Sequence, residues 1–329
     1  MSLMFTEHLI GLARIARRVG WRIPTWVQGA GGNVSLKAEK DGLHYLLVKA
    51  SGIRLDQVTP SNGIAAVDVN KFAKKFNFKM SPSNNFDLEK SEAEYVEALR
   101  TSQITLDGKN KSERPSMETG FHLALSAKVV VHHHSLPAIL MAYHLSDEPT
   151  LKPWLERQVG GKVVLVPPLM PGRELSSAIY EHRDAKVILL SNHGIILGLQ
   201  DIREISNWEN VEQKFLSNYG YHDLLNAWTS SHRENLANQV KSAAIPLKFY
   251  LPDTAVFAKE IESAIIPQQI IGGETFYILN SQRRDLIELW AAQQLLYASC
   301  PRLSTLPDSI VNRIRTLPTE QYRIKKLAS

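Results

Sequence analysis

Residues 127–138, AKVVVHHHSLPA, place three consecutive histidines at the end of a valine run. The segment KVVVHHHS predicts a buried strand, because short apolar runs rich in β-branched residues favour strands. Successive side chains of a strand point to opposite faces, so His132 and His134 share one face and His133 points to the other. Two imidazoles about 7 Å apart along a strand can reach a common metal ion. His132 and His134 are therefore candidate metal ligands, and His133 is not.

A third histidine follows a second apolar run. In VILLSNHGIILG, residues 187–198, His193 comes just after a predicted strand and directly before Gly194. Glycine lets the backbone turn sharply there, which exposes the imidazole. Three histidines that leave a fourth position open are typical of catalytic zinc sites, and another divalent ion is possible. A turn histidine without a ligand is the alternative interpretation of His193.

Glu118 is the candidate general acid or base. It lies at the start of METGFHLALS, residues 117–126, a predicted short helix just before the histidine strand. A carboxylate in that position could exchange a proton beside a metal ion. The alternative is a glutamate that the helix dipole favours in a first turn. His122 lies on the same side of the helix, and we expect a structural role for it.

A glycine-rich turn, QGAGGNVS at residues 28–35, is a candidate anion site. Such turns can offer backbone N–H groups to a phosphate, although a tight turn without a ligand is the alternative. The stretch is neither a P-loop nor a dinucleotide fingerprint, because no Lys-Ser/Thr pair follows it and no strand–turn–helix frames it. For Lys49, phosphate binding or a solvated position is favoured over Schiff-base chemistry. Two further stretches, VKASG (48–52) and PSME (115–118), add polar groups to this turn. Together the three stretches supply the candidate substrate or phosphate contacts Gly32, Asn33, Lys49, Ser51, Gly52 and Ser116.

The expected elements place the chain in the α/β class. NVSLKA and LHYLLVKAS predict a hairpin around EKDG, and GKVVLVPP and AKVILLSN predict further strands between helices. Residues 101–116 are polar and predict a loop. In the last part of the chain, DTAVFA (253–258) predicts a strand and SQRRDLIELWAAQQLLYAS (281–299) predicts a helix. The basic ending YRIKKLAS (322–329) predicts a frayed terminus.

Composition indicates a protein of the reducing cytoplasm. The 329 residues contain one cysteine, Cys300, so an internal disulfide is excluded. No apolar run approaches the roughly 18 residues that span a bilayer, and the amphipathic N-terminus lacks the apolar segment of a signal peptide. The net charge of +5 is too dilute to indicate nucleic-acid binding, but it suits acidic small molecules. We therefore expect neither a membrane nor a nucleic-acid partner.

Four motifs in fixed order resemble those of the class II aldolase/adducin family. They are GAGGNVS, VKASG, ETGFH with VVVHHHS, and SNHGIILG. The resemblance covers roughly residues 5–225 and is nearest to the aldolase portion of rhamnulose-1-phosphate aldolase-like proteins. It implies a three-layer α/β/α fold with a central mixed or antiparallel sheet, followed by a C-terminal α/β extension. We expect a catalytic domain over residues 1–240 and an extension, packed on it, over residues 241–329.

The resemblance also implies roles for residues. A catalytic divalent metal, usually zinc, would be held by His132, His134 and His193. Glu118 would be the catalytic acid. The phosphate cradle of the family would fall on Gly32, Asn33, Ser51, Gly52 and Ser116. The sequence departs from simple sugar-phosphate aldolases at Ala30, where Thr or Ser is common, and at Met117, where a second Ser is common.

The activity that this resemblance implies is metal-dependent aldol cleavage or condensation of a ketose phosphate, with dihydroxyacetone phosphate and an aldehyde as the cleavage products. A sugar-phosphate 4-epimerase and a thio-sugar-phosphate dehydratase on the same scaffold are alternatives. A non-catalytic adducin-like scaffold is a third alternative, although such proteins have lost metal ligands that this sequence retains. The resemblance further implies a homo-oligomer, most often a tetramer.

Overall fold

The computed structural model describes residues 3–79, 85–105, 113–229 and 243–328. Within these residues the larger sheet has seven strands, in the order β3-β2-β1-β4-β7-β6-β5. β5 and β6 run parallel, whereas every other neighbouring pair is antiparallel. The strands are β1 (Asn33–Lys40), β2 (Leu43–Lys49), β3 (Ile64–Asp68), β4 (Val129–His133), β5 (Val163–Val166), β6 (Val187–Leu190) and β7 (Gly194–Leu199).

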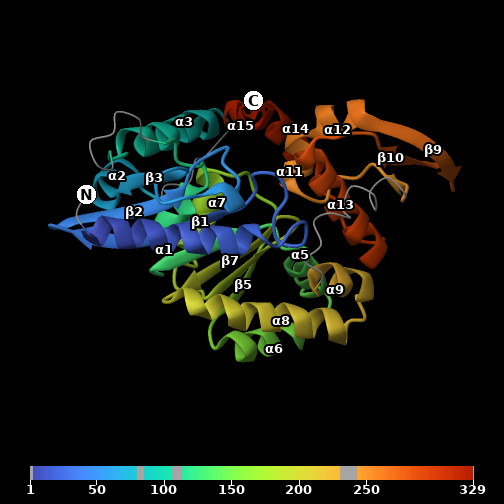
Figure 1. Cartoon of the computed structure of the whole chain (residues 1–329), viewed down its shortest axis with the longest axis horizontal. Coiled ribbons are helices and arrows are strands. Elements are labelled where there is room, and N and C mark those ends of the chain that lie inside the picture. The colour runs from blue at the N-terminus through green and yellow to red at the C-terminus, as the bar shows by residue number, and fades with distance from the viewer. Residues whose placement is uncertain (1–2, 80–84, 106–112, 230–242, 329) are drawn as a thin grey trace.

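Helices cover both faces of this sheet and make three layers (Figure 1). On one face lie α1 (Leu3–Gly20), α5 (Leu136–His144), α6 (Leu151–Val159), α8 (Ile205–Asn218) and α9 (His222–Thr229). On the other lie α2 (Val69–Lys75), α3 (Asn85–Thr101), α4 (Thr119–Ala124) and α7 (Arg173–Tyr180). Two short 3-10 helices are η1 (Leu55–Gln57) and η2 (Ile202–Glu204). Among the helices of the described residues, none is long and apolar enough to cross a bilayer.

The histidine strand shows why the sheet is buried on both faces. Val129 and Val131 belong to the core under α1, α5 and α8, whereas Val130 belongs to the core under α4 and α7. Side chains alternate between the two faces of a strand, so His132 points to the side of Val130 and His133 to the opposite side. The predicted three-layer α/β/α fold with a mixed sheet is confirmed.

The C-terminal residues form a second sheet with its own helices. Strands β8 (Ile245–Pro246), β10 (Glu274–Leu279) and β9 (Ile265–Ile271) lie in that order, and in Figure 1 the β9–β10 hairpin extends away from the larger sheet. A cluster around Phe257, Leu289 and Trp290 forms the core of this part. Ala292 and Leu296 instead join the core of the larger sheet, so the two parts pack closely. The helices are α11 (Pro252–Val256), α12 (Ala258–Ala264), α13 (Arg284–Ser299), α14 (Asp308–Thr316) and α15 (Pro318–Ala328).

Two expectations about the C-terminal part are wrong. Residues 253–258 do not form a strand, because α11 begins at Pro252, a residue suited to a first helical turn. All side chains of α11 are buried, so the apolar pattern could not separate a strand from a buried helix. The ending is not frayed either, because Ile324 and Leu327 of α15 pack against the C-terminal core. The expected boundary between residues 240 and 241 lies outside the described residues.

Two strands of the larger sheet, β3 and β7, are not among the strands predicted from the sequence. The connection between β6 and β7 spans residues 191–193, and Gly194 has a φ of 131°. A Cβ at Gly194 would lie 2.3 Å from the carbonyl oxygen of His133. This close approach lets the β6–β7 hairpin bring His193 to the end of β4.

Candidate metal centre and pocket

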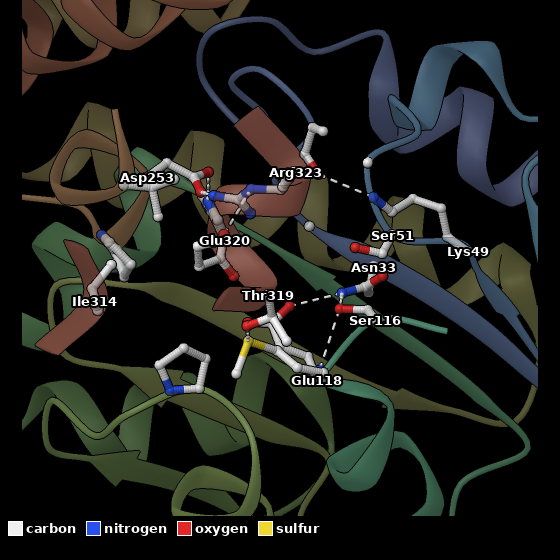
Figure 2. A pocket seen from close by; sticks show the side chains of 18 of the residues that line it. Asn33, Lys49, Ser51, Ser116, Glu118, Asp253, Ile314, Thr319, Glu320 and Arg323 are labelled. Atoms are coloured by element: carbon white, nitrogen blue, oxygen red, sulfur yellow. Dashed lines mark hydrogen bonds and ion pairs between the residues drawn. The ribbon is translucent and has the colours of Figure 1, made fainter. Parts of the chain in front are cut away.

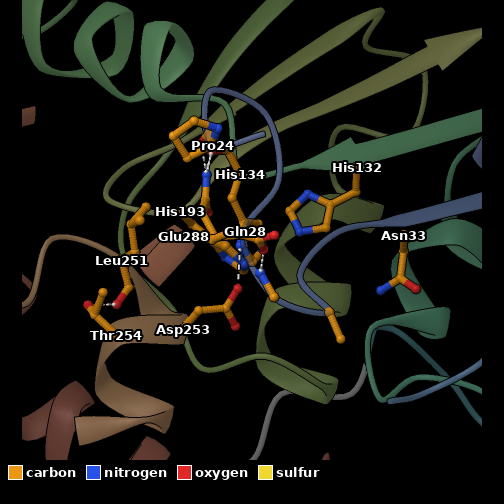
Figure 3. Close-up of polar contacts among 12 residues, drawn as sticks. Pro24, Gln28, Asn33, His132, His134, His193, Leu251, Asp253, Thr254 and Glu288 are labelled. Atoms are coloured by element: carbon orange, nitrogen blue, oxygen red, sulfur yellow. Dashed lines mark hydrogen bonds and ion pairs between the residues drawn. The ribbon is translucent and has the colours of Figure 1, made fainter. Parts of the chain in front are cut away.

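Three histidines from neighbouring strands meet at one end of the sheet (Figure 3). His132 lies near the end of β4, His134 follows that strand directly, and His193 precedes β7, which pairs with β4. The ring centroids are 5.1 Å apart for His132 and His134, and 4.9 Å separates each of them from His193. With Glu118 they form a buried group whose possible ligand atoms all lie within 4.8 Å of one another.

The ring nitrogens are oriented as a metal site requires. His132 Nδ1 donates a hydrogen bond to the carbonyl oxygen of Ile195 over 2.9 Å, and His134 Nδ1 lies 2.8 Å from Asp253 Oδ2. With Nδ1 protonated, the free lone pair of each ring is on Nε2. Neither Nε2 has a hydrogen-bond partner within the part of the chain that the structure describes. Since buried polar atoms are normally paired, this donor set fits a divalent ion such as Zn²⁺.

Glu118 immediately precedes α4 and faces the histidines. Its Oε1 lies 3.3 Å from His193 Nε2 and 3.6 Å from His132 Nε2. Its Oε2 accepts a hydrogen bond from Asn33 Nδ2 over 2.7 Å. Burial by itself would raise the pKa of Glu118, but the electrostatic influence of the neighbouring His132 and His193 holds this pKa well below its usual value. The ionised carboxylate therefore points into the space beside the three rings.

The sequence-predicted substrate contacts line one pocket with these groups (Figure 2). Asn33 Nδ2 donates to Ser116 Oγ over 3.2 Å, and Ser116 Oγ also accepts the backbone N–H of Glu118. The structure thus brings the predicted residues together although they come from separate turns. The predicted residues in the pocket wall are Gly32, Asn33, Lys49, Ser51, Gly52, Ser116, Glu118, His134 and His193.

Lys49 is not solvated, which corrects one of the two roles considered for it. Its side chain is buried, and Nζ donates to the carbonyl oxygens of Ala30 over 3.0 Å and Ile53 over 2.8 Å. Burial, helped by the nearby charge of Arg323, lowers the pKa of Lys49 to about 7. The ammonium group therefore supports the glycine-rich turn and retains little positive charge above neutral pH.

Four polar residues of the C-terminal part also line the pocket and were not predicted. Arg323 of α15 donates through Nη2 to Asp253 Oδ1, and its Nε lies 2.9 Å from Glu320 Oε2 (Figure 2). Burial favours the neutral form of Asp253, but Arg323 and His134 hold the pKa of this carboxyl well below its usual value. Asp253, an acid in the mainly apolar stretch PDTAVFA, was the signal that could have indicated a site residue. The stretch as a whole predicts a strand, so this signal pointed to no site. The four residues are Asp253, Thr319, Glu320 and Arg323.

Helix α15 closes the pocket. The enclosed cavity measures about 30 Å³, which holds about two water molecules. Thr319 Oγ1 lies 3.2 Å from Met117 Sδ, and a Cβ at Gly52 would lie 2.8 Å from Lys326 Cδ.

A buried carboxylate anchors the turn after the histidine strand. Glu212 of α8 accepts a hydrogen bond from Ser135 Oγ over 2.5 Å, and Ser135 also caps α5. Because Ser135 is adjacent to His134, these bonds hold the backbone from which that imidazole projects. Glu212 additionally accepts the indole N–H groups of Trp26, Trp208 and Trp228.

Comparison with known proteins connects this arrangement to one family. The sequence profile of the Class II Aldolase and Adducin N-terminal domain matches residues 11–209. The matched stretch contains β1 to β7, the three histidines and Glu118, and it ends before α11 and α15. The comparison with curated proteins gave no match.

Three solved structures are similar to parts of this chain. The N-terminal class II aldolase domain of a conserved protein from Thermoplasma acidophilum has 23% identity and a TM-score of 0.47, over 61% of this chain and 92% of that one. An aldolase II superfamily protein from Pseudomonas syringae has 17% identity and a TM-score of 0.45, over 74% and 87%. An L-fuculose-1-phosphate aldolase from Thermus thermophilus has 17% identity and a TM-score of 0.40, over 64% and 97%.

Proposed function

The chain belongs to the class II aldolase and adducin family, and from this premise we propose that it is a carbon–carbon lyase acting on a ketose phosphate. The reaction is reversible aldol cleavage, with dihydroxyacetone phosphate and an aldehyde as products. The observation that carries this proposal is the buried group of three histidines and Glu118, which combines a metal-type donor set with an ionised carboxylate.

We assign His132, His134 and His193 as ligands of one divalent ion, which we expect to be zinc. When bound, the ion supplies Lewis acidity at the carbonyl group of the substrate. The protein orients the rings through the bonds made by Nδ1 of His132 and His134. Burial of the whole group strengthens each electrostatic interaction, because little water screens it.

Glu118 is the proposed general acid and base. Asn33 holds one carboxylate oxygen, which leaves Oε1 directed toward the histidines. A substrate carbon held beside the three rings would therefore lie within reach of Oε1. In condensation, Glu118 removes the proton of that carbon, and the resulting enediolate forms the C–C bond with the aldehyde, whose oxygen takes up a proton. In cleavage, the hydroxyl on the aldehyde side loses its proton, the C–C bond breaks with its electron pair left on the same carbon, and Glu118 returns the proton to that carbon.

We assign the phosphate of the substrate to the wall of the pocket that carries Asn33, Ser51 and Ser116. Hydroxyl and amide groups of Asn33, Ser51 and Ser116 line this region, and the turns containing Gly32 and Gly52 offer backbone N–H groups. Lys49 supports the same wall through its bond to the Ala30 carbonyl.

Proton exchange of dihydroxyacetone phosphate in deuterated water tests the reaction without knowledge of the aldehyde. We expect zinc-loaded protein to exchange the proton at the carbon next to the carbonyl. Glu118→Gln should keep the metal and lose about two to four orders of magnitude in exchange rate, the usual worth of a positioned acid or base. Glu97→Gln, on the exposed side of α3, should behave as wild type. Wild-type protein that binds dihydroxyacetone phosphate but exchanges no proton would exclude the aldolase and favour the dehydratase or scaffold alternatives.

We propose that the protein is a homo-oligomer, with a tetramer expected from its family. Strand β9 supports self-association, because it is an uncharged edge strand with Ile270 and Ile271 exposed to solvent. Light scattering at micromolar concentration measures the mass directly. A monomer under these conditions would contradict the proposal, and Ile270→Lys is expected to weaken an assembly that uses this edge.

We also propose a cytoplasmic location. Cys300 is the single cysteine of the sequence and is buried, so the fold does not depend on an oxidising compartment. Fractionation of cells that express the native protein tests this, and recovery mainly with membranes or secreted material would contradict it.

A further inference from the structure

Asp253 makes a contact with the histidine group that the family match does not cover. Its Oδ2 lies 2.8 Å from His134 Nδ1, and both side chains are about 3% exposed. Asp253 belongs to α11, beyond the matched residues 11–209. The group of possible ligand atoms contains His134 but not Asp253, so this carboxylate lies behind the imidazole, on its Nδ1 side.

A second partner compensates the charge of this buried carboxylate. Arg323 Nη2 donates to Asp253 Oδ1, while Arg323 Nε lies close to Glu320. A buried charge is strongly unfavourable unless a partner compensates it. Asp253 can therefore remain ionised at depth, with its other oxygen 2.8 Å from His134 Nδ1.

The glycine-rich turn packs directly on the same pair. A Cβ at Gly31 would lie 2.3 Å from Asp253 Oδ2 and 2.7 Å from His134 Nδ1. No side chain fits there unless the carboxylate and the imidazole move apart. Gly31 therefore helps to hold the pair in contact from the opposite side.

We propose that Asp253 is a positioning residue of the metal site: it orients His134 so that Nε2 faces the ion, and Arg323 holds Asp253 in place. The inference rests on the metal site of the proposed function. A carboxylate behind a ligating histidine fixes its tautomer and makes the ring a stronger ligand. In this protein the C-terminal part supplies both residues, so it contributes to metal affinity without contributing a ligand.

Asp253→Asn tests the geometry while preserving the size of the side chain. Arg323 donates to Oδ1, so the amide oxygen of the variant would face Arg323 and the amide N–H₂ would face His134. His134 Nδ1 would then accept a hydrogen bond, and the proton would move to Nε2, which cannot bind a metal in that form. The variant should therefore bind metal more weakly although every ligand is present.

The experiment titrates metal-free, full-length protein with Zn²⁺ in competition with a chromophoric chelator. Asp253→Asn should bind Zn²⁺ about 10- to 100-fold more weakly than wild type, the usual effect of losing such a partner. Arg323→Met should show a smaller loss in the same direction. The control is Asp285→Asn, which removes another buried carboxylate of the C-terminal part. Asp285 pairs with Arg283 at 2.6 Å and is not in the group of possible ligand atoms. This variant should bind Zn²⁺ as tightly as wild type.

Thermal unfolding of each metal-free variant shows whether it is folded. A folded Asp253→Asn that binds Zn²⁺ as tightly as wild type would overturn the proposal, even if its KM rose. If Asp253→Asn does not fold, Arg323→Met decides, and unchanged affinity in the folded variant overturns the proposal. The titration needs no substrate. Wild type that binds Zn²⁺ but exchanges no proton of dihydroxyacetone phosphate would therefore refute the aldol reaction and leave this inference standing.

Discussion

Adjacent histidines of this protein have unrelated surroundings, because a strand sends neighbouring side chains to opposite faces. His132 turns toward Glu118 and His193, whereas His133 stacks on Trp26 with ring centroids 4.3 Å apart. Burial lowers the pKa of His133 well below its usual value, so this ring behaves as an uncharged core residue. His132 and His133 therefore have different roles because they are neighbours in one strand and face its opposite sides.

Replacing individual histidines separates the metal site from the core. His134→Ala removes a proposed ligand and should abolish tight metal retention, as measured by metal analysis of the purified protein. His133→Ala removes a stacked core ring, so it should lower the free energy of unfolding by about 2 kcal/mol or more but retain the metal. Full retention in His134→Ala, or comparable metal loss in His133→Ala, would contradict the assignment.

Lys49 should make stability depend on pH in a predictable direction. Its pKa is about 7 in the folded protein and 10.5 in the reference state, so between these values the unfolded chain binds the extra proton. The contribution to the free energy of unfolding therefore rises with pH by up to about 1.4 kcal/mol per unit. From pH 7 to 9, wild type should gain about 2 kcal/mol relative to Lys49→Met in denaturant unfolding at equal metal content. A difference that stays constant with pH would contradict the burial of a titrating amine.

At the scale of elements, the β6–β7 hairpin decides whether three histidines can meet. Its connection brings His193 beside β4, and Gly194 lies against the backbone of His133 and His134. The pairing of β4 with β7 then sets the distance between rings that are far apart in sequence. The site is therefore formed by the end of β4, the β6–β7 turn and the start of β7.

Gly194→Ala should damage this hairpin. The new Cβ would lie 2.3 Å from the His133 carbonyl oxygen, and a φ of 131° is unsuited to alanine. We expect the free energy of unfolding to fall by roughly 2 kcal/mol or more and metal affinity to fall with it. Gly11→Ala is the matched control, because it lies within α1 with nothing within 4 Å and should stabilise by about 0.5 to 1 kcal/mol. Wild-type metal affinity in Gly194→Ala would show that this turn does not position His193.

At the scale of the whole molecule, the C-terminal part packs into the core of the part that carries the larger sheet. Glu288 of α13 accepts the backbone N–H of Gly29 over 2.8 Å and pairs with the buried Arg54 over 2.7 Å. Ala292 and Leu296 complete the core of the larger sheet. The part that carries the smaller sheet and the part that carries the larger sheet therefore share a buried interface.

A protein that ends at residue 240 should be unstable. It would lose the apolar partners of the larger core and leave Arg54 without Glu288, and breaking a buried ion pair from one side costs about 3–5 kcal/mol. We expect a large fall in melting temperature or aggregation, measured by circular dichroism during heating. Glu288→Gln in the full chain should reproduce part of the loss. A fragment of residues 1–240 as stable as the full chain would contradict this account.

The sequence alone predicted five of the seven strands of the larger sheet, all but β3 and β7, and the candidate residues of the first part. Alternation along KVVVHHHS separates His133 from His132 and His134, and the glycines beside His193 and Asn33 indicate turns. These signals are local: a strand period, a turn residue or a helix start depends on a few neighbouring residues. Strand pairing then brings these predicted residues together, and all of them except His132 line one pocket.

Only the tertiary structure decided what the last part of the chain contributes. Asp253 and Arg323 are 70 residues apart, and nothing in their neighbourhoods shows that they meet behind His134. The apolar stretch around Asp253 suits a strand as well as a buried helix, and the basic ending is typical of a loose terminus. Their positions depend on the packing of α11 and α15 against residues far away in sequence. That long-range packing, which no local pattern specifies, closes the pocket and completes the surroundings of the metal site.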